Sequence, residues 1–147
     1  MSNTISQLSI FLENRAGRLD EVLSILAGNG VNIVALSLAE TPDYGLLRLI
    51  VSDPRKGRIA LKECGITAMI TEVVALRVPH TTGSLSRAIH LLVENNINIE
   101  YMYAFANGLD ASAVLKADDL GLVVEVLRKG GFSVWKASEA YISNIWG

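Results

Sequence analysis

Two stretches of the sequence decide the fold: NRAGRL at residues 14–19 and HTTGSL at residues 80–85. Both have glycine in the fourth place and leucine in the sixth, and they lie 66 residues apart. The same shift places VNI at residues 31–33 on INI at residues 97–99. Such self-similarity predicts that one small structural module occurs twice in the chain.

The later part of the repeat and its junction set the predicted domain boundaries. A one-residue deletion is expected in the turn near Pro42 to Gly45, because a shift of 65 then aligns Asp53 with Asp118. One β-rich run, residues 67–78, is expected to close the first module and open the second without a flexible linker. The predicted domains are residues 1–71 and residues 72–147.

Hydrophobic periodicity gives both modules the same order of elements. Leu8, Ile10 and Leu12 recur at every second position, which is the period of a half-buried strand. The run that starts at Leu19 then places apolar residues at the i, i+3, i+4 and i+7 spacing of an amphipathic helix. Continued through each module, these patterns predict an α+β fold of two ferredoxin-like βαββαβ modules with antiparallel sheets, expected side by side.

Composition and charge exclude several classes of partner. Half of the residues are hydrophobic, 19% are charged and the formal net charge is −2, so the chain can form a packed core. The longest basic run is Arg55-Lys56, which predicts no nucleic-acid partner and no membrane partner. No apolar stretch approaches the ~20 residues that cross a bilayer. The lone Cys64 and the lack of an apolar leader lead us to expect a cytoplasmic protein.

The two glycine loops are the first candidates for a binding site. Gly17 and Gly83 remove a side chain at the start of a helix, where backbone N–H groups attract a carboxylate. Asn32 and Asn98 follow these helices and are expected to lie beside the loops, offering the donor and the acceptor that a zwitterion needs. The alternative is a structural role, in which glycine makes the turn and asparagine caps backbone groups.

The run SIFLENRAGRL at residues 9–19, followed by GVNI at residues 30–33, resembles the opening of ACT domains. In that family Asn-Arg-Pro-Gly precedes helix one and Val-Asn-Ile opens strand two, and the resemblance covers nearly the whole chain. Paired ACT domains place their sheets side by side and bind effector amino acids between one domain's first loop and its neighbour. The ligand contacts implied by position are Asn14, Arg15, Ala16, Gly17, Asn32, His80, Thr81, Thr82, Gly83 and Asn98.

The two loops depart from the family pattern in different ways. Ala16 stands where the family has proline, and His80 and Thr81 replace the asparagine and arginine of the loop in module two. The two sites are therefore expected to differ in ligand or in affinity.

An aromatic stripe is a second candidate surface. Tyr101, Tyr103 and Phe105 recur at every second position of an expected strand, where the first module has small residues. The stripe is either a wall for a ligand or partner subunit, or ordinary packing, to which aromatic side chains contribute large buried areas.

The sequence offers little for catalysis, metal binding or cofactor binding. His80 and His90 are ten residues apart, without Cys-x-x-Cys or His-x-x-x-His spacing, so no metal site is expected. Phosphate-binding loops, dinucleotide fingerprints and nucleophile elbows are absent from the sequence. The chain is therefore predicted not to be an enzyme and to need no cofactor.

The leading hypothesis is a regulatory protein that senses a free amino acid and forms a homodimer. The alternative is the regulatory small subunit of an amino-acid biosynthetic enzyme, because the opening also resembles the small subunit of acetolactate synthase. That family's second half is a different domain, whereas here it repeats the first. RNA binding and acylphosphatase activity are weaker hypotheses. The strand expected at residues 45–51 offers neither the exposed aromatics nor the basic surface that an RNA-binding strand needs, and Arg15 is the only candidate for a phosphate cradle.

Overall fold

The computed structural model describes residues 3–13, 15–40, 43–79, 81–107 and 110–136. These residues form four helices and seven strands with antiparallel pairings, which confirms the predicted α+β class. Contacts divide them into two compact units: module one comprises residues 6–71, and module two comprises residues 3–5 and 72–136. The side-by-side placement of the modules stays a prediction.

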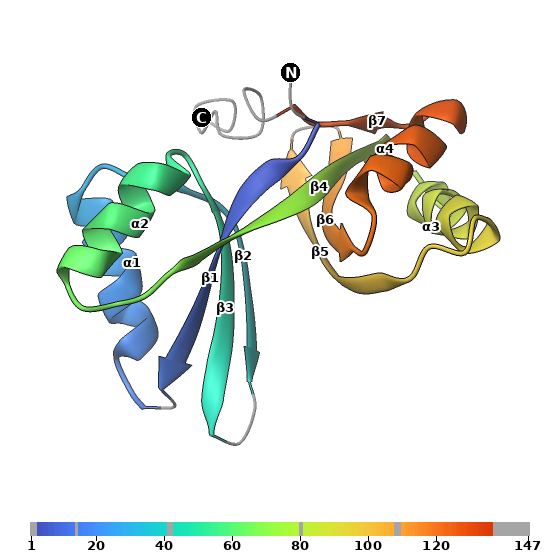
Figure 1. Cartoon of the computed structure of the whole chain (residues 1–147). Helices are drawn as coiled ribbons and strands as arrows, with labels where there is room; N and C mark the ends of the chain where they lie inside the picture. Colours follow the sequence, from blue (N-terminus) through green and yellow to red (C-terminus); the bar gives the residue numbers. More distant parts are fainter. Residues whose placement is uncertain (1–2, 14, 41–42, 80, 108–109, 137–147) are drawn as a thin grey trace. The chain divides into compact units, whose positions relative to one another are not determined.

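Module one contains two complete strands, all but the first residue of a third, and two helices. Its elements are β1 (Ile5–Glu13), α1 (Arg18–Gly28), β2 (Ile33–Glu40), β3 (Tyr44–Val51) and α2 (Pro54–Glu63), and β4 (Met69–Pro79) begins in it. Strand β3 lies between β2 and β1, and β4 is the next neighbour of β1. Both helices lie on one face of this sheet (Figure 1).

The core of module one lies between the two helices and the sheet. Leu8, Ile10 and Leu12 of β1 are buried there in one cluster with Val22 and Leu26 of α1. Burying a leucine side chain contributes about 1.5–3 kcal/mol. This shared core therefore fixes α1 against β1 and holds the turn between them in place.

Module two repeats the same plan. Its elements are β4, α3 (Ser84–Glu94), β5 (Ile99–Asn107), β6 (Asp110–Ala117), α4 (Leu120–Lys129) and β7 (Ser133–Val134). Strand β6 lies between β4 and β5, and β7 pairs with β4. Leu76 of β4 is fully buried in one cluster with Leu92 of α3 and Leu127 of α4.

The two modules correspond at a constant shift of 66 residues. Strands β2 and β3 pair Glu40 with Gly45, and β5 and β6 pair Ala106 with Ala111, so the number of residues between the paired strands is the same. The predicted one-residue deletion in this turn is therefore wrong.

The helix caps follow the same constant shift. The Asp53 carboxylate accepts a hydrogen bond from the backbone N–H of Lys56 at 3.1 Å, and the Asp119 carboxylate accepts one from Leu122 at 3.0 Å. The predicted alignment of Asp53 with Asp118 is wrong, because the cap must directly precede the first helical residue to reach these N–H groups.

Candidate functional site

The first loop of module one joins β1 to α1. Gly17 is the N-cap of α1 with φ 85°, a left-handed conformation that strains any residue with a Cβ atom. Its carbonyl accepts a hydrogen bond from the N–H of Glu21 at 2.9 Å, and none of the described side chains caps the helix. The N–H groups of the first turn therefore create a positive potential that can attract an anion. Asn14, one of the predicted contacts, lies outside the described residues.

A cavity of about 130 Å³ lies beside this loop. It is lined by Leu12, Glu13, Arg15, Arg18, Leu19, Leu38 and Gly45. A Cβ atom on Gly45 would lie 3.3 Å from Leu38 Cδ1, so a larger residue at this position would press against Leu38 in the cavity wall. The cavity is far smaller than the ~300–1,000 Å³ sites of drug-sized ligands, so it suits a small molecule.

Arg18 is the residue of this cavity that the sequence analysis missed. Its side chain is only 16% exposed, and Nη1 lies 2.9 Å from the carboxylate of Glu21. Its Nε is buried and has no hydrogen-bond partner among the described residues. Leaving such a donor unpaired costs about 1–3 kcal/mol, so a ligand oxygen placed there would be stabilised. The only sequence signal was its position directly after the left-handed glycine.

Arg15 and Ala16 lie at the exposed rim of the loop. Nε of Arg15 lies 3.3 Å from the Glu13 carboxylate, and both side chains are more than half exposed. Exposed pairs of this kind contribute little stability, about 0–1 kcal/mol. The mouth of the cavity thus carries one cation and one anion that a ligand could separate at low cost.

Asn32 lies at the far end of module one from Gly17, so the expectation that each asparagine lies beside its own module's loop is wrong. The loop follows the end of β1, α1 returns along the sheet, and β2 starts at the opposite end (Figure 1). The 11 residues of α1 separate the two positions by roughly 16 Å. Asn32 itself is exposed, and its backbone exchanges two hydrogen bonds with Ser52, at 2.9 and 2.8 Å.

The same separation holds in module two. Asn98 is exposed and follows α3, whose N-terminus carries Gly83. The helix again has 11 residues, so one small ligand cannot contact Gly83 and Asn98 of the same module.

The first loop of module two has the same backbone and different chemistry. Gly83 is the N-cap of α3 with φ 84°, and its carbonyl accepts a hydrogen bond from the N–H of Arg87 at 3.0 Å. The hydroxyls of Thr81 and Ser84 are hydrogen-bonded to each other, and Ser84 is only 1% exposed. Thr82 is exposed, and the predicted contact His80 lies outside the described residues.

Arginine side chains thus distinguish the two loops. At the shift of 66 residues, Thr81 and Ser84 occupy the places of Arg15 and Arg18. The guanidinium groups of module one are replaced in module two by two neutral hydroxyls that already bind each other. The first loop is therefore the better candidate for holding a carboxylate.

The aromatic stripe lies on the sheet face of module two that is turned away from its helices. Tyr103 pairs with Val114 and Phe105 with Ser112, whereas the neighbouring Leu115 belongs to the helix-side core. The three stripe residues, Tyr101, Tyr103 and Phe105, are half-buried. They are separate from the helix-side cluster. Whether the stripe forms a wall for a ligand or partner subunit, or serves only in packing, stays a prediction.

Trp135 packs on this same face of the sheet, and the sequence alone did not identify it. Its Nε1 donates a hydrogen bond to the fully buried hydroxyl of Ser112 at 2.8 Å. The guanidinium carbon of Arg77 lies 4.3 Å from the centre of its ring, a cation–π distance. These contacts anchor the chain just after β7.

Among the described residues, no group of three His, Cys, Asp or Glu side chains is placed to bind a metal ion. None of the described helices is long and apolar enough to cross a membrane.

Comparison with known proteins assigns the family. The model of the ACT domain pair matches residues 3–137. Protein BT0572 from Bacteroides thetaiotaomicron is 41% identical and has a TM-score of 0.90, with 95% of this chain and 96% of that chain covered. No curated protein matches the sequence.

Two regulatory subunits of aspartate kinase share the fold at low identity. The subunit from Thermus thermophilus is 14% identical with a TM-score of 0.64, covering 84% of this chain and 91% of that chain. The subunit from Thermus flavus is 12% identical with a TM-score of 0.61, covering 88% and 94%. The family match and the resemblance of the loops agree: the chain belongs to the ACT domain family, as an ACT domain pair.

Proposed function

We propose that the chain is a regulatory protein that binds a free amino acid at the first loop of module one and catalyses no reaction itself. The observation that carries this proposal is that Arg18 lines the cavity beside Gly17 and that its buried Nε has no hydrogen-bond partner among the described residues. A ligand carboxylate would satisfy this donor and the positive end of α1 together.

The charges at the cavity suit a zwitterion. Arg18 and the first turn of α1 attract the carboxylate, while Glu13 lies in the same wall and can accept a hydrogen bond from the ammonium group. Arg15, which is paired with Glu13 at the rim, would turn to the carboxylate when the ligand enters. A zwitterion can therefore pair its carboxylate with Arg18 and its ammonium group with Glu13.

The size and the apolar wall narrow the class of amino acid. The cavity holds about 130 Å³, and Leu12, Leu19 and Leu38 provide its apolar surface. We therefore propose a small apolar amino acid as the ligand, in preference to an aromatic or a charged one. Longer side chains would have to leave the cavity and expose apolar surface to water.

The loop of module two is proposed as a weaker site. Each predicted domain, residues 1–71 and residues 72–147, supplies one such loop. In the second loop, however, Thr81 and Ser84 offer hydroxyls in place of guanidinium groups. Hydrogen bonds to charged groups are worth about twice neutral ones, so the first loop should bind first.

The asparagines are proposed to act on a ligand held by another copy of the chain. Asn32 and Asn98 are exposed and lie an α-helix away from their own loops. If they contact the amino acid as the family resemblance implies, the loop must come from a different module, which a homodimer would supply. Ligand binding would then change how the copies associate, and this coupling would be the regulatory signal.

Two partners fit this role. In the preferred reading the chain acts as a homodimer that reports on a free amino acid. In the alternative it is the regulatory small subunit of an amino-acid biosynthetic enzyme, a reading to which the fold shared with the regulatory subunits of aspartate kinase adds weight. Co-purification with a large catalytic subunit would favour the alternative.

A thermal-shift screen against the common amino acids tests the proposal. A ligand at a hundred times its Kd adds about 2.7 kcal/mol of stability, which is a rise of roughly 5–10 °C in the melting temperature for a chain of this size. The largest rise is expected with a small apolar amino acid, and its size should grow with the logarithm of the ligand concentration.

Substitution of Arg18 then locates the site. Arg18→Gln should weaken binding about 10-fold or more, because it removes charge-assisted hydrogen bonds to the carboxylate. Arg58→Gln is the control, since Arg58 is exposed on α2 and the same charge is lost. No melting shift with any amino acid, or equal binding by both variants, would remove the proposal.

A further inference from the structure

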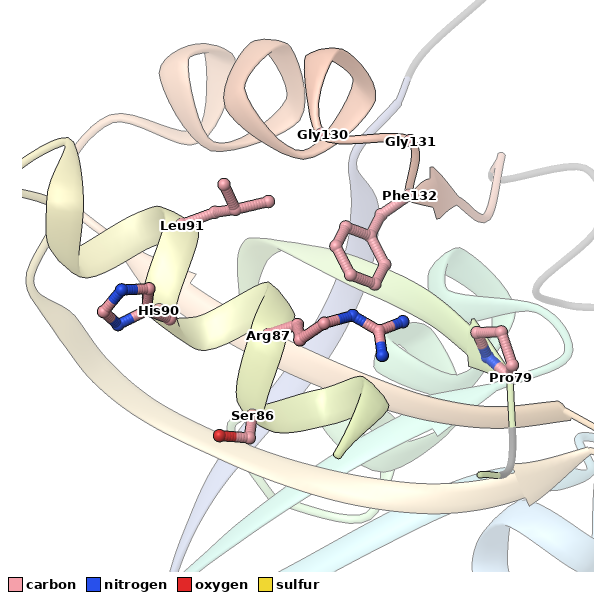
Figure 2. Close-up of a pocket in the computed structure, with 8 residues that line it drawn as sticks. All are labelled: Pro79, Ser86, Arg87, His90, Leu91, Gly130, Gly131 and Phe132. Carbon is pink, nitrogen blue, oxygen red and sulfur yellow. The ribbon is translucent and has the colours of Figure 1, made fainter. Parts of the chain in front are cut away.

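A second and larger cavity, of about 540 Å³, lies in module two between α3 and the turn that joins α4 to β7 (Figure 2). Its volume is within the ~300–1,000 Å³ range of small-molecule sites. Arg87, His90 and Leu91 of α3 form one wall, and Gly131 and Phe132 form the other, with Pro79 at one end. It is a different place from the cavity of module one.

An uncompensated positive charge faces this cavity. Figure 2 shows the Arg87 side chain extending along the cavity below the ring of Phe132, with its guanidinium toward Pro79. Within the described parts of the chain, no side chain forms an ion pair or hydrogen bond with that guanidinium. His90, by contrast, is paired with Glu94 at 2.7 Å. The cavity wall thus offers one guanidinium to an anion.

The opposite wall is held rigidly by backbone contacts. A Cβ atom on Gly130 would lie 2.2 Å from Leu91 Cδ1, so a larger residue there would require the Leu91 side chain to move. Gly131 has φ 88°, and the N–H of Phe132 donates to the carbonyl of Leu127 at 2.9 Å. The aromatic ring is therefore carried by a fixed turn, and the wall is formed before any ligand arrives.

Module one does not offer the same chemistry at the corresponding positions. Glu21 takes the place of Arg87 and is paired with Arg18 at 2.9 Å. Ile66 takes the place of Phe132 and is only 3% exposed. A cation beside an exposed part of an aromatic ring is thus a property of module two that the repeat does not require for folding.

We propose that this cavity is a second ligand site, which binds a small organic anion carrying a flat apolar group. The carboxylate or equivalent anion lies on the Arg87 guanidinium, and the flat group packs between Phe132, Leu91 and Pro79. Aromatic and aliphatic walls favour the apolar group, and the single cation fixes its orientation. The proposal is independent of amino-acid binding at the first loop.

Calorimetric titration of the full chain with phenylacetate tests the site. Phenylacetate supplies both the anion and the ring, phenylacetamide keeps the ring without the charge, and acetate keeps the charge without the ring. Phenylacetate is expected to bind at least about 10-fold more tightly than either, because each of the other two loses one of the two contacts. Equal binding of phenylacetamide, or no binding of phenylacetate at millimolar concentrations, would overturn the proposal.

Matched variants place the binding in this cavity. Arg87→Gln should weaken phenylacetate binding about 10-fold or more, whereas Arg58→Gln, which removes the same charge from module one, should not. Arg18→Gln should also leave phenylacetate binding unchanged, which separates this site from the first loop. Because Arg87 is exposed, its substitution should not impair folding. Loss of phenylacetate binding in Arg18→Gln with full binding in Arg87→Gln would contradict the assignment.

Discussion

Gly17→Ala separates the folding role of the first loop from its proposed binding role. Gly17 and Gly65 have nearly the same backbone, with φ 85° and 81°, and nothing lies within 4 Å of a Cβ atom built on either. Both are exposed glycines at helix ends, Gly17 before α1 and Gly65 after α2. Gly65→Ala is therefore a control with matched backbone strain that lies away from the proposed ligand.

The expected loss of stability follows from backbone strain alone. A left-handed conformation costs a residue with Cβ roughly 1–2 kcal/mol. Alanine also reduces the freedom of the unfolded chain, which offsets about 0.4–1 kcal/mol. Each variant should thus lose about 1 kcal/mol, which lowers the melting temperature by roughly 2–4 °C.

The two variants should differ in their affinity for the amino acid. An alanine at position 17 places a methyl group where the carboxylate approaches the first turn of α1, so affinity for the amino acid should fall about 10-fold or more. Urea unfolding measures the stability of both variants, and calorimetry measures their affinity. Unchanged affinity in Gly17→Ala, or an equal loss in Gly65→Ala, would refute the placement of the ligand.

Three other substitutions, the first with a matched control, test the fold and the site. Asp119→Ala should lose about 1 kcal/mol by thermal unfolding because it removes the cap of α4, and Asp118→Ala should lose much less; equal losses would contradict the assigned cap. Trp135→Phe leaves the buried hydroxyl of Ser112 without its donor, so urea unfolding followed by circular dichroism should show a loss of about 1–3 kcal/mol. Asn32→Ala should change stability by less than about 0.5 kcal/mol, since its backbone makes the hydrogen bonds to Ser52. It should weaken ligand binding about 5- to 100-fold in calorimetry, and normal binding would exclude Asn32 from the site.

The sequence contained enough to predict the elements and their class. Leu8, Ile10 and Leu12 are buried where period two placed them, and Val22 and Leu26 are buried where the helical spacing placed them. These patterns work because burial repeats with the geometry of each element. The alignment of the caps was wrong because two consecutive aspartates precede α4, and side-chain geometry alone distinguishes them.

The site was predicted less well, for reasons of three-dimensional arrangement. Closeness in sequence suggested that Asn32 adjoins the Gly17 loop, but a helix that returns along the sheet places them at opposite ends. The burial of Arg18 depends on its ion pair with Glu21 and on the surrounding apolar wall, which no sequence motif records. Phe132 likewise meets the α3 cavity only after folding.

An NMR titration tests the central claim most directly. Small apolar amino acids are added to the ¹⁵N-labelled protein, and the chemical shifts of its backbone amides are recorded at each concentration. Each N–H reports its own surroundings, so the measurement locates the ligand as well as detecting it. Saturable shifts should appear first at residues 17–21, at the start of α1, and only at higher concentration at residues 83–87, at the start of α3. Shifts elsewhere with these two segments unchanged, or no shift at any residue at millimolar ligand, would contradict amino-acid binding at the first loop.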